Sequence, residues 1–173
     1  MISSLSLLVS LASAPAEASA LDAEHFSVAV PAEVNLVGLT FGAHPEVLWR
    51  PFNPEGAFQL RGSVGLGVGP EMVVFPVSIG ARQLFFPTRM VRPGIGMGIQ
   101  LPNFKPRGHD FVFRVDSYFE VSIDVQIRED MRLGFAMSPQ FGGIYGGFGL
   151  GMSARLGLEM KLPDLLQVFS RSD

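Results

Sequence analysis

The sequence predicts an all-β fold: a single antiparallel, up-and-down β-barrel of eight strands that crosses a membrane. Three observations predict it. Apolar and polar residues alternate strictly over long segments, which is the period of a β-strand. The face opposite the apolar one is rich in glycine. Charged residues make up only 17% of the 173 residues, although 47% are hydrophobic, whereas an ordinary globular chain has about 25% charged residues.

The composition excludes several classes of protein. With 13 basic and 16 acidic residues the net charge is −3, and no basic block is present, so we expect no nucleic-acid partner. The absence of cysteine excludes disulfides and thiolate metal sites. The three histidines (His25, His44 and His109) do not have the spacing of a metal site, and we expect no metal and no cofactor. No apolar run reaches the ~18 residues of a membrane-spanning helix.

Residues 1–20 are predicted to be a cleaved signal peptide. An apolar core at residues 5–12 is followed by two small-x-small sites, Ala14-Pro15-Ala16 and Ala18-Ser19-Ala20, so cleavage is expected after Ala16 or Ala20. No Lys or Arg precedes the apolar core, and a buried N-terminal helix is the alternative. The domain prediction is then a signal peptide at 1–20, a β-barrel at 21–162 and a C-terminal tail at 163–173.

The alternation is clearest near the C-terminus. From Phe148 to Leu162 every second residue is apolar, and the residues between are glycine, serine or charged. Residues 113–127 follow the same rule, with Ser117 as the exception on the apolar side. A helix would scatter these residues around its circumference. Both segments are therefore predicted to be long strands with one apolar face.

Six shorter segments with weaker alternation complete the eight predicted strands: Phe26–Leu36, Glu46–Phe52, Phe58–Val68, Val73–Ala81, Ile95–Leu101 and Met131–Met137. Residues that favour chain reversal separate them. The predicted turns are Gly42-Ala43-His44-Pro45, Asn53-Pro54-Glu55-Gly56, Gly69-Pro70, Pro87 to Pro93, Pro102 to Asp110, Arg128-Glu129-Asp130 and Gly142 to Gly147.

Alternation alone does not say which face lies outside. A soluble barrel places its apolar face inward, and a membrane barrel places it toward lipid. The two clearest predicted strands, of about 15 residues each, exceed the ~9–11 residues needed to cross a bilayer. Glycine is a poor residue for a solvated strand surface, but it suits the crowded interior of an eight-stranded barrel. Both points favour a membrane barrel with the polar face enclosed.

Charged residues recur on the polar face at intervals, and we expect them to form ion pairs inside a filled lumen. This predicted lumen charge network consists of Arg61, Arg82, Arg114, Asp116, Glu120, Asp124, Arg132, Arg155 and Glu159. Its near balance of charge does not favour ion conduction. Aromatic residues near the strand ends are expected at the membrane interfaces: Trp49, Phe52, Phe85, Phe86, Tyr145 and Phe148.

The segment from Ser78-Ile79-Gly80-Ala81-Arg82 to Val91-Arg92-Pro93-Gly94-Ile95-Gly96-Met97-Gly98 resembles a hairpin of the small eight-stranded outer-membrane β-barrel proteins of Gram-negative bacteria. The resemblance covers about residues 24–162. It implies a signal peptide, passage through the periplasm and insertion into the outer membrane. The sequence departs from that group at its end, because the last strand stops near Leu162 and a tail follows. We expect residues 163–173 to form one amphipathic turn at the interface or to be disordered.

These observations predict a non-enzymatic, monomeric outer-membrane barrel. Its expected roles are structural anchoring, surface contact through loops, or passage of a small apolar molecule to the bilayer. The expected partners are outer-membrane lipid or lipopolysaccharide, whose phosphates the basic loop Lys105–Asp110 could contact.

Two alternatives stay open. One is an exported soluble barrel, similar to lipocalins, that binds an apolar ligand inside. The other is a lipid-modifying barrel hydrolase, since His25 and Ser27 share a strand face and resemble the pair of some lipid A deacylases.

Overall fold

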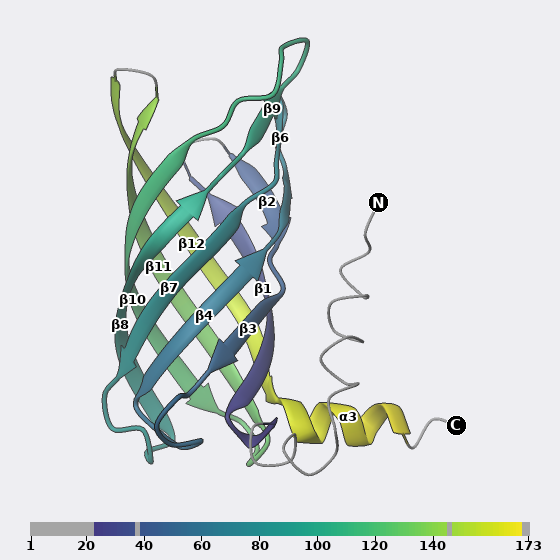
Figure 1. Ribbon diagram of the computed structural model, residues 1–173, viewed down its shortest axis with the longest axis vertical. Coiled ribbons are helices and arrows are strands. Elements are labelled where there is room, and N and C mark those ends of the chain that lie inside the picture. The colour runs from purple at the N-terminus through teal and green to yellow at the C-terminus, as the bar shows by residue number, and fades with distance from the viewer. Residues whose placement is uncertain (1–22, 37–38, 145–146, 171–173) are drawn as a thin grey trace.

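The computed structural model describes residues 23–36, 39–144 and 147–170, and they form one closed β-barrel followed by a helix (Figure 1). The predicted signal peptide lies outside these residues. Every neighbouring pair of strands is antiparallel. The bounds are β1 Phe26–Asn35, β2 Thr40–Ala43, β3 Glu46–Trp49, β4 Phe58–Val64, β5 Leu66–Val68, β6 Met72–Val74, β7 Val77–Leu84, β8 Val91–Leu101, β9 Phe104–Pro106, β10 Val115–Gln126, β11 Met131–Ile144, β12 Gly147–Lys161 and α3 Leu162–Ser170.

The twelve strands form eight staves, where a stave is one complete pass of the chain along the barrel wall. Four staves are each divided into two strands: β2 with β3, β4 with β5, β6 with β7, and β8 with β9. The order around the wall is β12-β11-β10-β8-β7-β4-β3-β1, and β1 pairs with β12 to close it. The predicted fold, an eight-stranded antiparallel up-and-down barrel with an apolar outer face, is thereby confirmed.

The divisions lie where proline or glycine interrupts a stave. One example is His44-Pro45 between β2 and β3, and another is Gly65 between β4 and β5. Proline has no N–H to donate to the ladder. The backbone nevertheless stays bonded across the breaks, since the amide of His44 donates to the carbonyl of Pro31 at 2.9 Å and the amide of Gly65 donates to Pro76 at 2.8 Å. The staves are therefore bent and not ended.

The predicted turn at Gly42–Pro45 is wrong for this reason. It marks the break inside the second stave, and the chain reverses instead between β1 and β2, near Leu39, whose φ is +47°. The predicted turn at Pro102–Asp110 likewise contains the short strand β9. At Gly42–Pro45 and at Pro102 the glycine or proline interrupts a strand without reversing it, whereas the chain does reverse at Arg107-Gly108, after β9.

After residue 162 the described chain is an ordered helix that is longer than the single amphipathic turn expected. Leu162–Ser170 form the helix α3. Because Pro163 cannot donate to a strand ladder but is tolerated in the first turn of a helix, the strand ends at Lys161 and a helix begins. Asp164 in that first turn complements the helix dipole.

The two ends of the barrel differ in what they carry. An even number of staves brings the start of β1 and the end of β12 to the same end, here called the terminal end, together with α3 (Figure 1). The β3–β4, β7–β8 and β10–β11 connections also lie there. The opposite, distal end carries the β1–β2, β5–β6, β9–β10 and β11–β12 connections.

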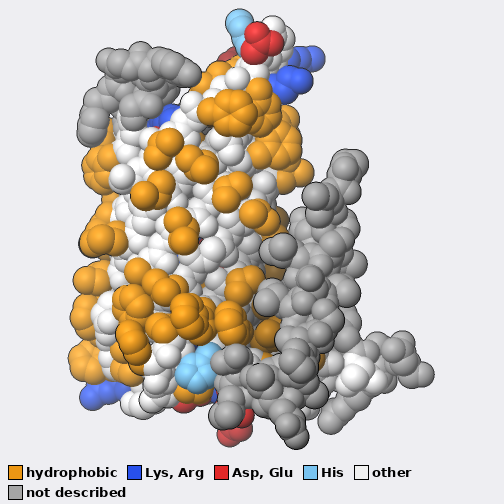
Figure 2. All heavy atoms as spheres, in the orientation of Figure 1, with side chains coloured by type: hydrophobic (Ala, Val, Ile, Leu, Met, Phe, Trp, Pro, Cys, Tyr) orange, Lys and Arg blue, Asp and Glu red, His pale blue; other side chains and the backbone are white. Residues whose placement is uncertain are grey.

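Apolar side chains point outward all along the wall. In β10 the residues from Val115 to Ile123 alternate between exposed and buried, and the apolar positions are the exposed ones. Ile123 is 46% exposed and Leu156 of β12 is 53% exposed. Figure 2 shows apolar side chains over the barrel wall and charged ones at its two ends. No helix among the described residues is both long and apolar enough to span a bilayer.

Glycines on the inner face make room for the large side chains that cross the lumen. Gly80 and Gly98 pair across β7 and β8, and Tyr118 pairs with Gly98 from the other side. A Cβ atom on Gly98 would lie 2.5 Å from the Tyr118 hydroxyl oxygen, and one on Gly80 would lie 2.1 Å from it. Both distances are too short for any real contact, so the tyrosine ring occupies the space that these glycines leave.

We expect Gly98→Ala to destabilise the barrel by about 1–3 kcal/mol, the usual cost of overpacking a filled interior. The control is Gly62→Ala, because a Cβ atom on Gly62 has no neighbour closer than 3.9 Å. The free energy of unfolding is measured by urea titration of the barrel in lipid vesicles. Equal stability of the two variants would contradict the packing argument.

Candidate functional site

The lumen holds the densest collection of charge among the described residues. Six arginines and six carboxylates are buried there in equal number. The arginines are Arg50, Arg61, Arg82, Arg92, Arg132 and Arg155, and the carboxylates are Glu33, Glu46, Asp116, Glu120, Asp124 and Glu159. Each lies on the inner face of its stave or continues that face beyond the strand end.

The middle of the lumen is organised around Glu120 of β10, which is fully buried. Arg61 of β4 donates to it through both terminal nitrogens, one of them at 2.9 Å. Arg155 of β12 contacts Glu120 and also donates to Glu46 of β3 at 2.6 Å. The Arg61 guanidinium donates in addition to the Tyr118 hydroxyl at 3.2 and 3.3 Å. Charge-assisted bonds therefore tie four staves together across the lumen.

A second cluster lies nearer the terminal end, around Glu159 of β12. Arg50 and Arg132 contact this carboxylate, the latter at 3.3 Å. Arg82 lies 3.7 Å from Glu159 and 3.0 Å from Asp124. Three guanidinium groups thus share two carboxylates in this cluster.

Glu55, in the connection between β3 and β4, extends over that mouth. It accepts a hydrogen bond from Lys161 at 2.6 Å and lies 3.4 Å from Arg132. Partial burial alone would raise the pKa of the Glu55 carboxyl, but Lys161, Arg132 and Arg92 together lower that pKa below its usual value of 4.5. The β3–β4 connection is therefore fastened by charge to the last two staves.

The distal part of the lumen is polar with fewer charges. Gln140 donates to Gln100 at 3.1 Å and to the hydroxyl of Ser153 at 3.2 Å. His44 lies 3.5 Å from Glu33. Side-chain amides and hydroxyls thus take over from guanidinium groups toward the distal end.

Little empty space is left between these side chains. One cavity of about 40 Å³ is lined by Arg61, Arg82, Asp124, Arg155 and Glu159 among others. A second, of about 10 Å³, lies in the distal part beside His44 and Tyr118. A cavity must offer about 10–15 Å³ to hold one water molecule, and ligand pockets measure about 300–1,000 Å³. Between the described side chains these two cavities have room for a few waters and not for a substrate.

The structure brings the nine residues of the predicted charge network into this lumen. Eight of them are buried, and the side chain of Arg114 is 16% exposed beside its partner Asp116. Sequence reasoning missed Arg50, Arg92, Glu33, Glu46 and His44. The sequence pattern did contain the information for Glu46 and Arg50. Together with Leu48 they occupy alternate positions of one predicted strand and therefore share a face.

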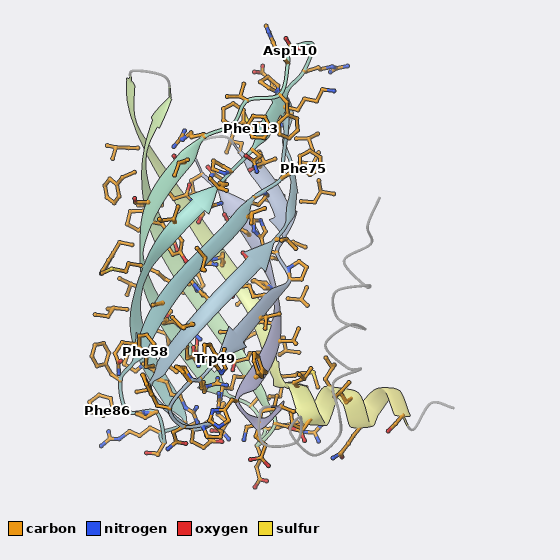
Figure 3. The ribbon with its side chains drawn as sticks, viewed as in Figure 1. Trp49, Phe58, Phe75, Phe86, Asp110 and Phe113 are labelled. Atoms are coloured by element: carbon orange, nitrogen blue, oxygen red, sulfur yellow. The ribbon has the colours of Figure 1, made fainter. Side chains whose placement is uncertain are left out.

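The described interface aromatics form a girdle at the terminal end. Trp49 stacks on Phe26, with ring centroids 6.2 Å apart, and Phe52 packs beside Phe58. Phe85 and Phe86 are exposed in the β7–β8 connection. Figure 3 shows Trp49, Phe58 and Phe86 together toward the end that carries α3. Of the predicted set, Tyr145 and the side chain of Phe148 lie outside what the structure describes.

Other phenylalanines gather toward the distal end. Phe111 packs against Phe75, with ring centroids 5.8 Å apart, and against Phe113 at 5.2 Å. Figure 3 labels Phe75 and Phe113 there, below Asp110 of the β9–β10 connection. These two groups of rings thus lie toward the two ends of the barrel wall, while Phe119 and Phe135 are exposed between them.

His25 and Ser27 are both engaged by Arg50. The Ser27 hydroxyl accepts a hydrogen bond from the Arg50 guanidinium at 2.7 Å, and His25 Nδ1 contacts the Arg50 carbonyl oxygen. Ser27 is fully buried. A nucleophilic serine needs a base within hydrogen-bond reach, and here its hydroxyl is held by an arginine. Within the described residues no cluster of three or more His, Cys, Asp or Glu has the arrangement of a metal site.

Comparison with known proteins agrees with this architecture. The chain is similar to the N-terminal β-barrel domain of Pseudomonas aeruginosa OprF, with a TM-score of 0.66 and 13% identity over 78% of this chain and 95% of that domain. It is also similar to neisserial surface protein A (NspA), with a TM-score of 0.58 and 11% identity over 79% of this chain and 94% of that one.

No protein-family model and no curated protein matches the sequence. Since both structural identities are low, the similarity concerns the fold. At that level the resemblance to small eight-stranded outer-membrane barrels is confirmed.

Glu120→Gln is expected to lower the free energy of unfolding by about 3–5 kcal/mol, because it leaves Arg61 and Arg155 buried beside a neutral group. Urea titration in lipid vesicles measures the change, with Glu71→Gln as the exposed control. The double variant Arg61→Met/Glu120→Leu should lose less free energy of unfolding than Glu120→Gln alone, because it removes both charges of the Arg61–Glu120 pair. A larger loss in the double variant would contradict the ion-pair account.

Glu55→Gln should show a pH-dependent effect. The pKa of Glu55 is lowered in the folded barrel. The ionised carboxylate therefore stabilises the folded barrel above about pH 4.5, and this contribution is lost as the pH falls through the folded-state pKa. At neutral pH the variant should be less stable by roughly 0.2–1 kcal/mol, the range for exposed ion pairs, and the difference should vanish once the pH falls below the lowered folded-state pKa of Glu55. Glu129→Gln, in the exposed β10–β11 turn, is the control. A pH-independent difference would contradict this assignment.

Proposed function

We propose that the protein is a structural outer-membrane β-barrel of a Gram-negative bacterium, exported to the periplasm by its N-terminal signal peptide, which is then cleaved after Ala16 or Ala20. The observation that carries this proposal is the inverted polarity of the barrel. Side chains such as Ile79, Val121 and Leu156 cover the outside, while twelve charged side chains are buried inside. Soluble monomers rarely expose apolar patches larger than a few hundred Å². A continuous apolar wall requires hydrocarbon around it.

The closed sheet supports the same environment. In a bilayer each backbone N–H and C=O must be bonded within the protein, and only helices and closed barrels achieve this. The pairing of β1 with β12 leaves the wall without an open edge. Closure also removes the strand edge through which sheets associate, which supports a monomer.

The filled lumen favours a structural role over transport. Ion pairs cross the lumen at two levels, around Glu120 and around Glu159, and the cavities between them hold only a few waters. This filling supports a lumen that passes neither a hydrated ion nor a small apolar molecule. Of the predicted roles, anchoring and surface contact through the distal connections remain the best supported.

The two alternative functions have less support. A lipocalin-like barrel needs an apolar interior, and this interior is polar and charged. A hydrolase that uses His25 and Ser27 needs a reachable serine hydroxyl, and that of Ser27 is buried and bonded to Arg50. Both observations support a non-enzymatic membrane protein.

The partners we propose are outer-membrane lipids. The chain reaches the membrane from the periplasm, so the terminal end would face the periplasm and the distal end the exterior. Lys105 and Arg107 are exposed at the distal end, close to the phenylalanine cluster around Phe111. This order of cation above aromatic ring suits the phosphates and acyl chains of lipopolysaccharide.

The test is membrane extraction together with conductance. Expressed with its N-terminal segment in a Gram-negative host, the protein should stay with the outer membrane after carbonate washing and need detergent for release. Unheated samples should migrate differently from boiled ones, because the closed barrel resists detergent. Planar bilayers containing it should show no stable ion current. Release by carbonate would overturn the membrane assignment, and steady channels would overturn the closed lumen.

A further inference from the structure

The helix α3 leaves the barrel sideways at the terminal end. Figure 1 shows it running outward from the end of β12 and not along the barrel axis. It contacts β12 and β1. Along the barrel axis it lies at the level where Figure 3 labels Phe86 of the terminal girdle, somewhat farther toward the terminal end than Trp49. Because aromatic girdles mark the membrane interface, the helix emerges at the boundary between hydrocarbon and water.

The sequence of α3 is amphipathic. Apolar residues occur at positions 162, 165, 166 and 169, which is the spacing of one helix face. Asp164, Gln167 and Ser170 fall between them. Leu166 is 45% exposed, so the barrel does not cover it. An exposed leucine at an interface has lipid as its nearest apolar surroundings.

We propose that α3 lies in the plane of the membrane, with Leu165 and Leu166 in the acyl-chain boundary of the leaflet at the terminal end and with Asp164 and Gln167 toward water. The inference rests on the proposed function, since it requires the barrel to be in a bilayer. The occupant we infer is phospholipid, because the apolar wall of the barrel continues directly into this helix at Lys161 and Leu162.

The charge of the helix predicts how it binds. Asp164 is the acidic residue of the first turn, and the last turn has no basic residue. Helices that bind anionic lipids carry Lys or Arg on the polar face. The association of α3 must therefore come from apolar burial, and we expect it to be insensitive to anionic lipid content and to salt.

The helix α3 adjoins the seam at which β1 and β12 close the barrel. The helix begins directly after Lys161, whose register partner in β1 is Ser27, and Lys161 also bonds Glu55. A helix held in the interface fixes the end of β12 against β1, at the one seam that joins the two ends of the barrel sequence.

The absence of cysteine makes a direct test simple. Leu166→Cys and Gln167→Cys are each labelled with the environment-sensitive fluorophore NBD and folded into phosphatidylcholine vesicles, with and without phosphatidylglycerol. The label at position 166 should emit at shorter wavelength and be quenched several-fold more by a lipid nitroxide near the headgroups than the label at position 167. The difference should be the same in both lipid mixtures and at high salt.

The outcomes separate this inference from the function on which it rests. Equal, water-like emission at both positions on a heat-modifiable, inserted barrel would overturn the helix placement and leave the barrel function standing. Shielding of position 166 without lipid quenching would also overturn it, since a protein segment would then cover the helix. Quenching that needs phosphatidylglycerol or disappears in salt would overturn the apolar mode of binding. An unlabelled barrel that does not insert would overturn both.

Discussion

The pairing of β1 with β12 is the constraint on which the rest of the structure depends. Nine residue pairs, from Ser27–Lys161 to Asn35–Ser153, join the two ends of the barrel sequence. A hydrocarbon environment cannot satisfy an open sheet edge, so the apolar wall is tolerable only when this seam is closed. Closure in turn determines the diameter of the lumen, because an eight-stranded barrel has room inside for side chains and little else.

This narrow lumen explains the chemistry of the interior. The inner faces of the staves are polar, since the outer faces must be apolar, and the polar side chains therefore meet across a short distance. A buried ion is costly unless it is paired and hydrogen-bonded. Arg61 of β4 and Arg155 of β12 converge on Glu120 of β10, and glycines such as Gly98 make space for neighbours such as Tyr118. Charge pairing and packing are thus two results of the same geometry.

Much of the site could be predicted, and the limits are physical. Strict alternation assigns Asp116, Glu120 and Asp124 to one face without any tertiary information. It cannot say that Glu120 meets Arg61, because partners across a lumen depend on the stagger of staves that are far apart in sequence. Alternation in the predicted strand Glu46–Phe52 also places Arg50 on the same face as Glu46, but it does not reveal that Arg50 meets Ser27 and Glu159.

The sequence by itself determined the class of fold, the number of staves and the face that each well-patterned residue occupies, because a period of two is a local property of the backbone. Only the tertiary structure decided the strand bends at His44-Pro45, the cross-lumen partners and the direction of α3. These depend on closure, which brings the first and last staves together. Proline and glycine carry the same local signal in a turn as in a bent stave, and only the neighbouring stave distinguishes the two.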